Sequence, residues 1–384
     1  MSKHQVLVIG GIHHNILGVI RSLGFARIPD IKVILVGKEP DFVSRSKYIK
    51  KKNIVKIASD NLLLGALFKI GREAQEKPIV ICSSDTSISI IDQNYDELSK
   101  FFILPNAQNK QGEINRLMSK SVQCQIAEQC GLNVPQSICT NDATNLEKWN
   151  IFPCIIKPSE SINGSKSDIK ICHTPDELVC ATKEFKGNEF QIQQFIEKDS
   201  EFQLIGCSLN HGKDVTIPGY TSIIRQPDNT NTGYLQYKGF DSFISDSFLT
   251  KVKKFLQTTG YEGLFSVEFL RDKKGQDYFL EINMRNDGNS FCVTVAGINL
   301  PCLWYQNETG TQVTGDTSKV RPVYFMPEIE DLREAVHQKV GLFTWLMQFL
   351  NTEAHAVFYF KDPAPFIYRL FAEFKRIFIK KLKH

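Results

Sequence analysis

The feature that most constrains the fold is a regular alternation of strand and helix patterns along the first hundred residues. Short apolar runs typical of buried strands alternate with stretches of helical apolar spacing. The strand patterns are Gln5–Ile9, Lys32–Val36, Asn53–Ile57 and Ile79–Cys82, and the helical patterns are Asn15–Leu23, closed by Gly24, and Asn61–Gln75. Such alternation predicts a doubly wound parallel sheet, so we expect an N-terminal α/β domain over residues 1–110.

Ligands of such sheets bind at the carboxyl ends of the strands. This places His13 and Asn15, which follow the first strand, and Asp85, which follows the fourth, at the mouth of a cleft. We expect these three residues to shape a substrate pocket, although ordinary loop residues fit the pattern equally well. The turn after the first strand lacks the Gly-x-Gly-x-x-Gly spacing, so a dinucleotide site is not favoured.

Composition excludes several classes of protein. The chain has 384 residues, of which 42% are hydrophobic and 23% charged, which suits a folded protein of two to three domains. Its 46 basic and 42 acidic residues leave a net charge of +4, too low to indicate nucleic acid as a partner. Apolar runs stay shorter than the roughly 18 residues of a membrane span. The ten cysteines lack Cys-x-x-Cys spacing, so we expect reduced thiols in a soluble, cytoplasmic protein.

Two strand patterns that contain glutamates give the first indication of a functional site. Ser266–Leu270 and Tyr278–Asn283 alternate at period two around a turn-rich connection, which predicts a β-hairpin. In this hairpin Glu268 lies opposite Glu281, with Asn283 on the same face. Two facing carboxylates repel unless a cation lies between them, and their oxygens suit Mg²⁺. A polar hairpin side that faces solvent explains these residues equally well without a metal.

Further candidate residues precede the hairpin. Lys120 begins a helical pattern, and Lys157 ends an apolar strand, where a lysine needs an anionic partner. The following loop, Pro158–Asp168, is rich in small residues, which can fold over phosphates with their backbone N–H groups. The candidate residues of this loop are Ser161, Asn163, Gly164 and Ser165. The candidates of the polar bend that follows are Gln194, Phe195, Ile196 and Glu201.

The order of these motifs, which end in Glu281-Ile-Asn-Met-Arg285, resembles that of the ATP-grasp ligases. The resemblance covers Gln111–Pro301 and is closest to carboxylate–amine ligases similar to D-aspartate ligase and to half of a carbamoyl-phosphate synthase large chain. It implies an ATP-grasp domain of two α+β subdomains over residues 111–310. The small subdomain, 111–190, carries the phosphate lid, and the large subdomain, 191–310, carries the metal site. Met284, where the family often has proline, and the single glycine of the lid depart from the family pattern.

The resemblance also implies a role for each candidate. The ATP phosphates meet Lys120 and Lys157, and the lid over them includes Ser161, Asn163, Gly164 and Ser165. Adenine meets backbone groups of Gln194, Phe195 and Ile196, and the ribose hydroxyls meet Glu201. Two Mg²⁺ ions, for which Mn²⁺ can substitute, are held by Glu268, Glu281 and Asn283. The catalytic cations are Arg285, Lys157 and, as a second candidate for the charge of Arg285, Arg225.

The implied activity is ATP-dependent joining of a carboxylate to an amine, with ADP and phosphate as products. The carboxylate is activated as an acyl phosphate, which the amine then attacks. Two alternatives stay open, a nucleotide-binding scaffold without turnover and an ATP-dependent phosphotransferase. The partners expected are small-molecule carboxylates and amines, and a homodimer is compatible with the resemblance.

The last part of the chain, residues 311–384, is expected to form a helical extension. Pro363–His384 has apolar residues at helical spacing on one face and basic residues on the other. Such a helix either contacts an anionic membrane at its surface or packs on its own domain.

Overall fold

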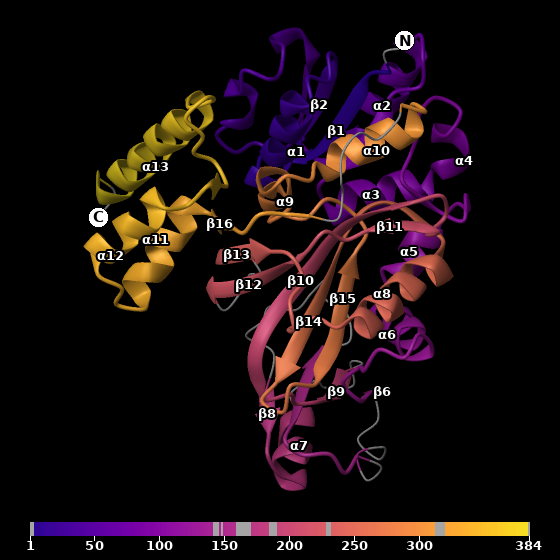
Figure 1. Cartoon of the computed structure of the whole chain (residues 1–384), viewed down its shortest axis with the longest axis vertical. Coiled ribbons are helices and arrows are strands. Elements are labelled where there is room, and N and C mark those ends of the chain that lie inside the picture. The colour runs from indigo at the N-terminus through magenta and orange to yellow at the C-terminus, as the bar shows by residue number, and fades with distance from the viewer. Residues whose placement is uncertain are drawn as a thin grey trace.

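The computed structural model describes residues 4–140, 146, 149–158, 170–183, 190–227, 232–311 and 319–382. Its N-terminal sheet is parallel, in the order β3-β2-β1-β4. Its strands are β1 Val6–Gly11, β2 Ile31–Val36, β3 Ile54–Ile57 and β4 Ile79–Cys82, and its main helices are α1 His14–Phe25, α2 Leu63–Glu73 and α3 Asp85–Gln93. The expected doubly wound domain is therefore confirmed (Figure 1).

One expectation within this domain is wrong. Gly24 does not close α1, because the helix continues to Phe25 and the left-handed residue is Arg27, with φ 57°. Glycine is needed at position 24 for a different reason. A Cβ atom there would lie 2.3 Å from the Tyr48 ring, so the close packing of this ring requires a residue without a side chain.

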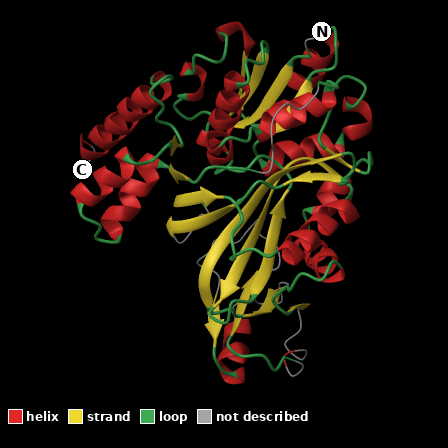
Figure 2. Ribbon diagram, viewed as in Figure 1, coloured by secondary structure: helices red, strands yellow, loops and turns green. Residues whose placement is uncertain are grey.

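The central sheet is long and mostly antiparallel, in the order β15-β14-β10-β12-β13-β16-β17 (Figure 2). Its strands are β10 Lys198–Leu209, β12 Tyr220–Arg225, β13 Tyr234–Lys238, β14 Tyr261–Asp272, β15 Asp277–Asn283, β16 Val323–Met326 and β17 Ala354–His355. Two short strands pair at its side, β5 Asn106–Ala107 with β14 and β11 Asp214–Thr216 with β10. The predicted hairpin is confirmed as β14 and β15. The sheet also takes β16 and β17 from the segment expected to be only a helical extension.

A smaller antiparallel sheet, in the order β6-β9-β7-β8, forms the far end of the molecule (Figure 2). Its strands are β6 Ser137–Thr140, β7 Cys154–Pro158, β8 Lys170–Cys172 and β9 Phe190–Gln194. The helix α7, Pro175–Thr182, begins at Thr174, whose hydroxyl accepts a hydrogen bond from the Glu177 N–H at 3.2 Å. This small sheet has its own apolar core, so it is a separate packing unit.

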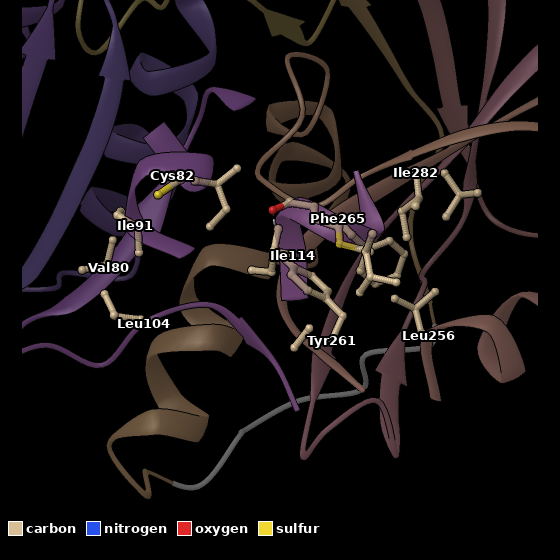
Figure 3. Close-up of a cluster of buried hydrophobic side chains, with 14 of the residues drawn as sticks. Val80, Cys82, Ile91, Leu104, Ile114, Leu256, Tyr261, Phe265 and Ile282 are labelled. Atoms are coloured by element: carbon tan, nitrogen blue, oxygen red, sulfur yellow. Dashed lines mark hydrogen bonds between the residues drawn. The ribbon is translucent and has the colours of Figure 1, made fainter. Parts of the chain in front are cut away.

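The other two sheets share their apolar cores. One cluster runs from Val80 and Cys82 on β4 to Tyr261 and Phe265 on β14, and Figure 3 shows these residues with Ile114 between them. The helices α5 Glu113–Leu117, α6 Lys120–Gln129 and α8 Asp246–Thr259 also contribute apolar side chains to this cluster. The N-terminal sheet is therefore fixed against the central sheet.

The C-terminal part adds the helices α9 Phe291–Ala296, α10 Leu300–Glu308, α11 Glu328–His337, α12 Leu342–Leu350 and α13 Ala364–Leu382. The last three lie together beside the N-terminal sheet (Figure 1). A fully buried ion pair ties this part to α1, because Arg21 Nε donates to Asp362 Oδ2 at 3.1 Å.

Candidate active site

A cleft of about 510 Å³ lies where the N-terminal sheet meets the hairpin of β14 and β15. Its walls are the first turns of α1 and α3, the facing side chains of the hairpin and the loop after β15. The lining residues are His13, Asn15, Ser83, Ser84, Asp85, Thr86, Gln203, Thr232, Glu268, Glu281, Asn283, Arg285, Asp287 and Gly288. The carboxyl ends of the parallel strands thus open on this cleft, as expected for such a sheet.

Glu268 and Glu281 face each other across the hairpin, as the sequence predicts. Glu268 is 7% exposed and accepts hydrogen bonds from Gln203 Nε2 at 3.2 Å and Asn283 Nδ2 at 3.1 Å. Burial, with smaller effects from the charges of Glu281 and Asp287, raises the pKa of Glu268 to about 8. A cation bound between Glu268 and Glu281 would offset the repulsion between their two negative charges.

The donor set fits a hard divalent cation. Two carboxylates and the Asn283 amide line one wall, and Mg²⁺ takes its other ligands from water and substrate phosphates. The described residues include no cluster of three His, Cys, Asp or Glu side chains that could hold a metal alone. The carboxylates of Glu268 and Glu281 and the amide of Asn283 are therefore the residues that would hold Mg²⁺ beside a nucleotide.

Lys120 and Lys157 approach the same wall. Lys120, the first residue of α6, has its Nζ 3.0 Å from Glu281 Oε2. Lys157 on β7 donates to Gln193 Oε1 at 2.9 Å. Burial, followed by the charge of Lys120, lowers the pKa of Lys157 to about 8. Among the described residues, the hydrogen-bond partner of Lys157 is thus a neutral amide rather than the predicted anion, and a phosphate would supply that negative charge.

Arg285 joins the two halves of the cleft. Its Nε and Nη2 each donate to a different carboxylate oxygen of Asp85 at 2.9 Å, and Nη2 also donates to Asn283 Oδ1 at 3.2 Å. Asp85 is the first residue of α3, whose N-cap is Ser84. A predicted substrate residue and a predicted catalytic residue are therefore paired with each other, 200 positions apart in the chain.

His13 and Asn15 line the cleft, but their local contacts are structural. The His13 ring accepts a hydrogen bond from the Asn15 N–H and so caps α1. The Asn15 amide donates to the carbonyls of Ser83 at 3.1 Å and Asn286 at 2.9 Å. Asn15 therefore holds three walls of the cleft together.

The predicted adenine segment begins at Gln194, the last residue of β9, and leads toward β10. The N–H of Gln194 donates to the Gln136 carbonyl at 2.8 Å, and the N–H of Phe195 donates to the Pro153 carbonyl at 3.0 Å. A contact between this segment and adenine would therefore use its other backbone groups, including those of Ile196. Glu201, on β10, contacts Lys198 at 3.1 Å and Gln226 at 2.7 Å. The predicted lid residues Ser161, Asn163, Gly164 and Ser165 lie outside the described residues.

Arg225 does not join the site. Its Nε and Nη2 donate to the two carboxylate oxygens of Asp331 at 2.9 and 2.7 Å, and Nη2 also donates to Gln348 Oε1. Both members of this ion pair are buried, and Trp345 donates to the Asp331 carboxylate as well. The guanidinium therefore attaches α11 and α12 to the central sheet and does not line the cleft, in contrast to its predicted catalytic role.

Several polar residues at the site were not predicted. Gln203 accepts a hydrogen bond from Asn289 at 2.8 Å while donating to Glu268, so it orients that carboxylate. Asp287 accepts from the Ser266 hydroxyl at 2.9 Å and lines the cleft. The available signal was a run of polar residues directly after a strand, of which Asn286, Asp287, Asn289 and Ser290 are buried.

Two proteins of named activity resemble this chain in sequence. No protein-family model matches the chain. A D-aspartate ligase of Enterococcus faecium is 24% identical over 327 residues, which cover 78% of this chain and 75% of the relative. A 2-oxoglutarate carboxylase small subunit of Hydrogenobacter thermophilus is 26% identical over 167 residues, and that match spans only 32% of the relative.

Solved structures extend the likeness to most of the chain. An N5-carboxyaminoimidazole ribonucleotide synthetase with ADP has a TM-score of 0.65 at 14% identity and covers 88% of this chain and 86% of its own. Biotin carboxylase of Campylobacter jejuni has a TM-score of 0.63 at 16% identity, with 83% and 74% covered. L-amino acid ligase of Bacillus licheniformis has a TM-score of 0.60 at 17% identity, with 84% and 80% covered. Together with the three sheets, these likenesses show that the chain has the fold of these proteins and that it resembles the ATP-grasp carboxylate–amine ligases.

Proposed function

We propose that this protein is an ATP-dependent ligase that activates a carboxylate as an acyl phosphate and joins it to an amine. The observation that carries the proposal is the pairing of Glu268 with Glu281, approached by Lys120 and Lys157 and followed by Arg285. The two carboxylates can bind the metal ion of a nucleoside triphosphate, and the lysines and the arginine can bind its phosphates. The D-aspartate ligase and L-amino acid ligase among the similar proteins support the choice of reaction class.

The reaction follows from positioning and electrostatics. A substrate carboxylate oxygen attacks the γ-phosphorus, the bond to the β-phosphate oxygen breaks, and ADP leaves. The amine nitrogen then attacks the acyl carbon, phosphate leaves, and the nitrogen loses a proton. Lys120 and Lys157 would contact the phosphates, and Arg285 would bind the transferred phosphoryl group or the carboxylate through its planar fork. Mg²⁺, when bound by Glu268, Glu281 and Asn283, supplies charge neutralisation at the phosphoryl oxygens.

The nucleotide base is proposed to meet the segment of Gln194, Phe195 and Ile196, with Glu201 at the ribose hydroxyls. The lid residues Ser161, Asn163, Gly164 and Ser165 complete the phosphate site in this proposal. His13 and Asp85 shape the acceptor side, and Asn15 supports it.

ADP release tests the proposal. The purified protein with Mg²⁺ is assayed against panels of carboxylates and amines, separately and combined. We expect release of ADP that requires one carboxylate and one amine together, and loss of that release in Glu281→Gln. The matched control is Glu97→Gln, because Glu97 is an exposed carboxylate on the short helix α4, Tyr95–Leu98, away from the cleft. ATP binding without turnover favours the scaffold alternative, and transfer of phosphate to a hydroxyl favours the phosphotransferase alternative.

Two finer statements about partners are part of the proposal. A homodimer is compatible with the relatives, one of which was crystallised as a domain dimer. Within the described residues, no helix is long and apolar enough to span a membrane. Contact with a membrane surface through the basic amphipathic helix α13 stays a proposal, because α13 exposes Phe371 and Phe374 beside Lys375 and Arg376.

A further inference from the structure

Large exposed apolar side chains gather at the C-terminal helices rather than being spread over the surface. In this part, α12 and the residues around it expose Val336, Leu342, Phe343, Leu346, Met347, Leu350 and Phe360, and α13 exposes Ile367, Phe371 and Phe374. Phe343 is 76% exposed and Leu342 is 71% exposed. A gathering of exposed apolar side chains on neighbouring helices marks a candidate interaction site.

The helix α12 separates its apolar side chains into two faces. Trp345 and Phe349 stack at 5.5 Å, and Trp345 donates to the buried Asp331, so this face packs on the protein. Leu342, Phe343 and the exposed leucines that follow point outward. The helix carries no charged residue from Leu342 to Leu350, which is unusual for a helix in contact with water.

The packing of α13 brings basic residues to the same end of this unit. Glu330 on α11 pairs with Arg369 on α13, and Arg333 pairs with Glu373 at 2.9 Å. From the first ion pair to the second, the residue numbers rise along both helices. The helices α11 and α13 therefore run parallel, and their C-terminal ends lie side by side. The end of α11 leads directly into α12, which begins at Leu342. The last turns of α13 therefore lie near the start of α12.

The charge of those last turns is of one sign. Among the described side chains after Glu373, Lys375 and Arg376 are exposed and basic, and Arg376 also pairs with Glu373 at 2.8 Å. Exposed Lys339 precedes α12. An apolar face bordered by lysine and arginine is complementary to lipid tails beneath anionic headgroups.

We propose that the outward face of α12, centred on Leu342 and Phe343, inserts into the surface of an anionic membrane, with the end of α13 as its basic border. This inference goes beyond the proposed ligase activity, because it concerns a surface on the C-terminal helices and names α12 as the inserting element. A second copy of the chain is the rival occupant, because an exposed apolar face also suits self-association.

Vesicle co-sedimentation of the full chain tests the proposal. We expect binding to vesicles of phosphatidylglycerol and phosphatidylcholine, and about tenfold weaker binding to pure phosphatidylcholine. The double variant Leu342→Ser with Phe343→Ser should lose about tenfold or more of the binding. The matched control is Leu62→Ser, since Leu62 is 53% exposed in the N-terminal part. Lys375→Gln should weaken binding at about 0.1 M salt and have little effect at about 1 M, where screening is nearly complete.

Thermal unfolding and ATP turnover of the double variant check that it remains folded, because both residues lie outside the cleft. Equal binding of wild type and double variant, or no binding of the wild type to anionic vesicles, overturns the proposal. Light scattering after size exclusion tests the rival occupant. A dimer that becomes a monomer in the double variant, without vesicle binding by the wild type, assigns the face to self-association instead.

Discussion

Replacing Glu268 by glutamine separates two effects of this carboxylate, the loss of folding stability caused by burying its charge and the gain in binding of Mg²⁺ and ATP. Glu268 is nearly buried, and its pKa is raised from 4.5 to about 8, first by burial and then by Glu281. A carboxyl group with a raised folded-state pKa holds its proton more tightly in the folded state, so stability falls as pH rises from about 4.5 to about 8. Since pH 7 lies about 2.5 units above the ordinary pKa of 4.5 and below the raised pKa, the loss of folding stability at pH 7 is about 3 kcal/mol. Glutamine removes this ionisation and keeps an oxygen for Gln203 and Asn283 to donate to.

We therefore expect Glu268→Gln to be more stable than the wild type in the absence of divalent cations, by up to about 3 kcal/mol at pH 7 and by little at pH 4.5. Urea unfolding in EDTA at both pH values measures the difference. With Mg²⁺ and ATP this difference in stability should largely disappear. A ligand at about 100 times its Kd adds about 2.7 kcal/mol to the wild type, and the variant should gain much less.

Two results would refute this reasoning. One is a variant that is less stable than the wild type at pH 7 in EDTA, since that would mean that the charge of Glu268 stabilises the free protein. The other is an unchanged gain in stability with Mg²⁺ and ATP, which would remove Glu268 from the metal site.

Three further substitutions have expected outcomes. Asp85→Asn should lower KM for the carboxylate substrate about fivefold and leave KM for ATP unchanged in the ADP-release assay. The half-exposed Asp85 carboxylate competes with the substrate carboxylate for Arg285, and its ion pair with Arg285 contributes about 1 kcal/mol. Arg225→Met should lower the free energy of unfolding in urea by about 3–5 kcal/mol, since Asp331 stays buried without its cation; an unchanged midpoint would contradict the structural role. Glu328→Gln should stabilise the protein by up to about 3 kcal/mol at pH 8 but not at pH 4.5, because burial raises the pKa of Glu328 to about 7; equal shifts in thermal unfolding at both pH values would exclude this.

The parts of the fold that local patterns encode were predictable. Period-two alternation places Glu268 opposite Glu281, because a short connection between two strands leaves few registers that bury the apolar face. The alternation of strands and helices likewise predicts the parallel sheet. Each of these predictions depends on residues that are close together in the sequence.

The errors and omissions concern partners that are distant in the sequence. Arg225 was a second candidate for the charge of Arg285, and its partner Asp331 follows 106 positions later, too far away for a local pattern to show the pairing. Asp85 and Arg285 were assigned separate roles for the same reason. Side-chain pairing across a fold leaves no period in the sequence, so only the packed structure shows which charges are already neutralised.

The cleft is built from parts of the chain that cannot move independently. Asn15 donates to Asn286, and Asn286 donates back to the Asn15 amide oxygen, so the first helix is joined to the loop that carries Arg285. The Asn286 N–H also donates to the Cys82 carbonyl at 3.0 Å, which fixes this loop to the last strand of the N-terminal sheet. Arg285 and the acceptor wall are thereby held in one geometry before a substrate arrives, as a reaction that depends on positioning requires. Lys157, by contrast, lies on the small sheet, which packs around an apolar core of its own.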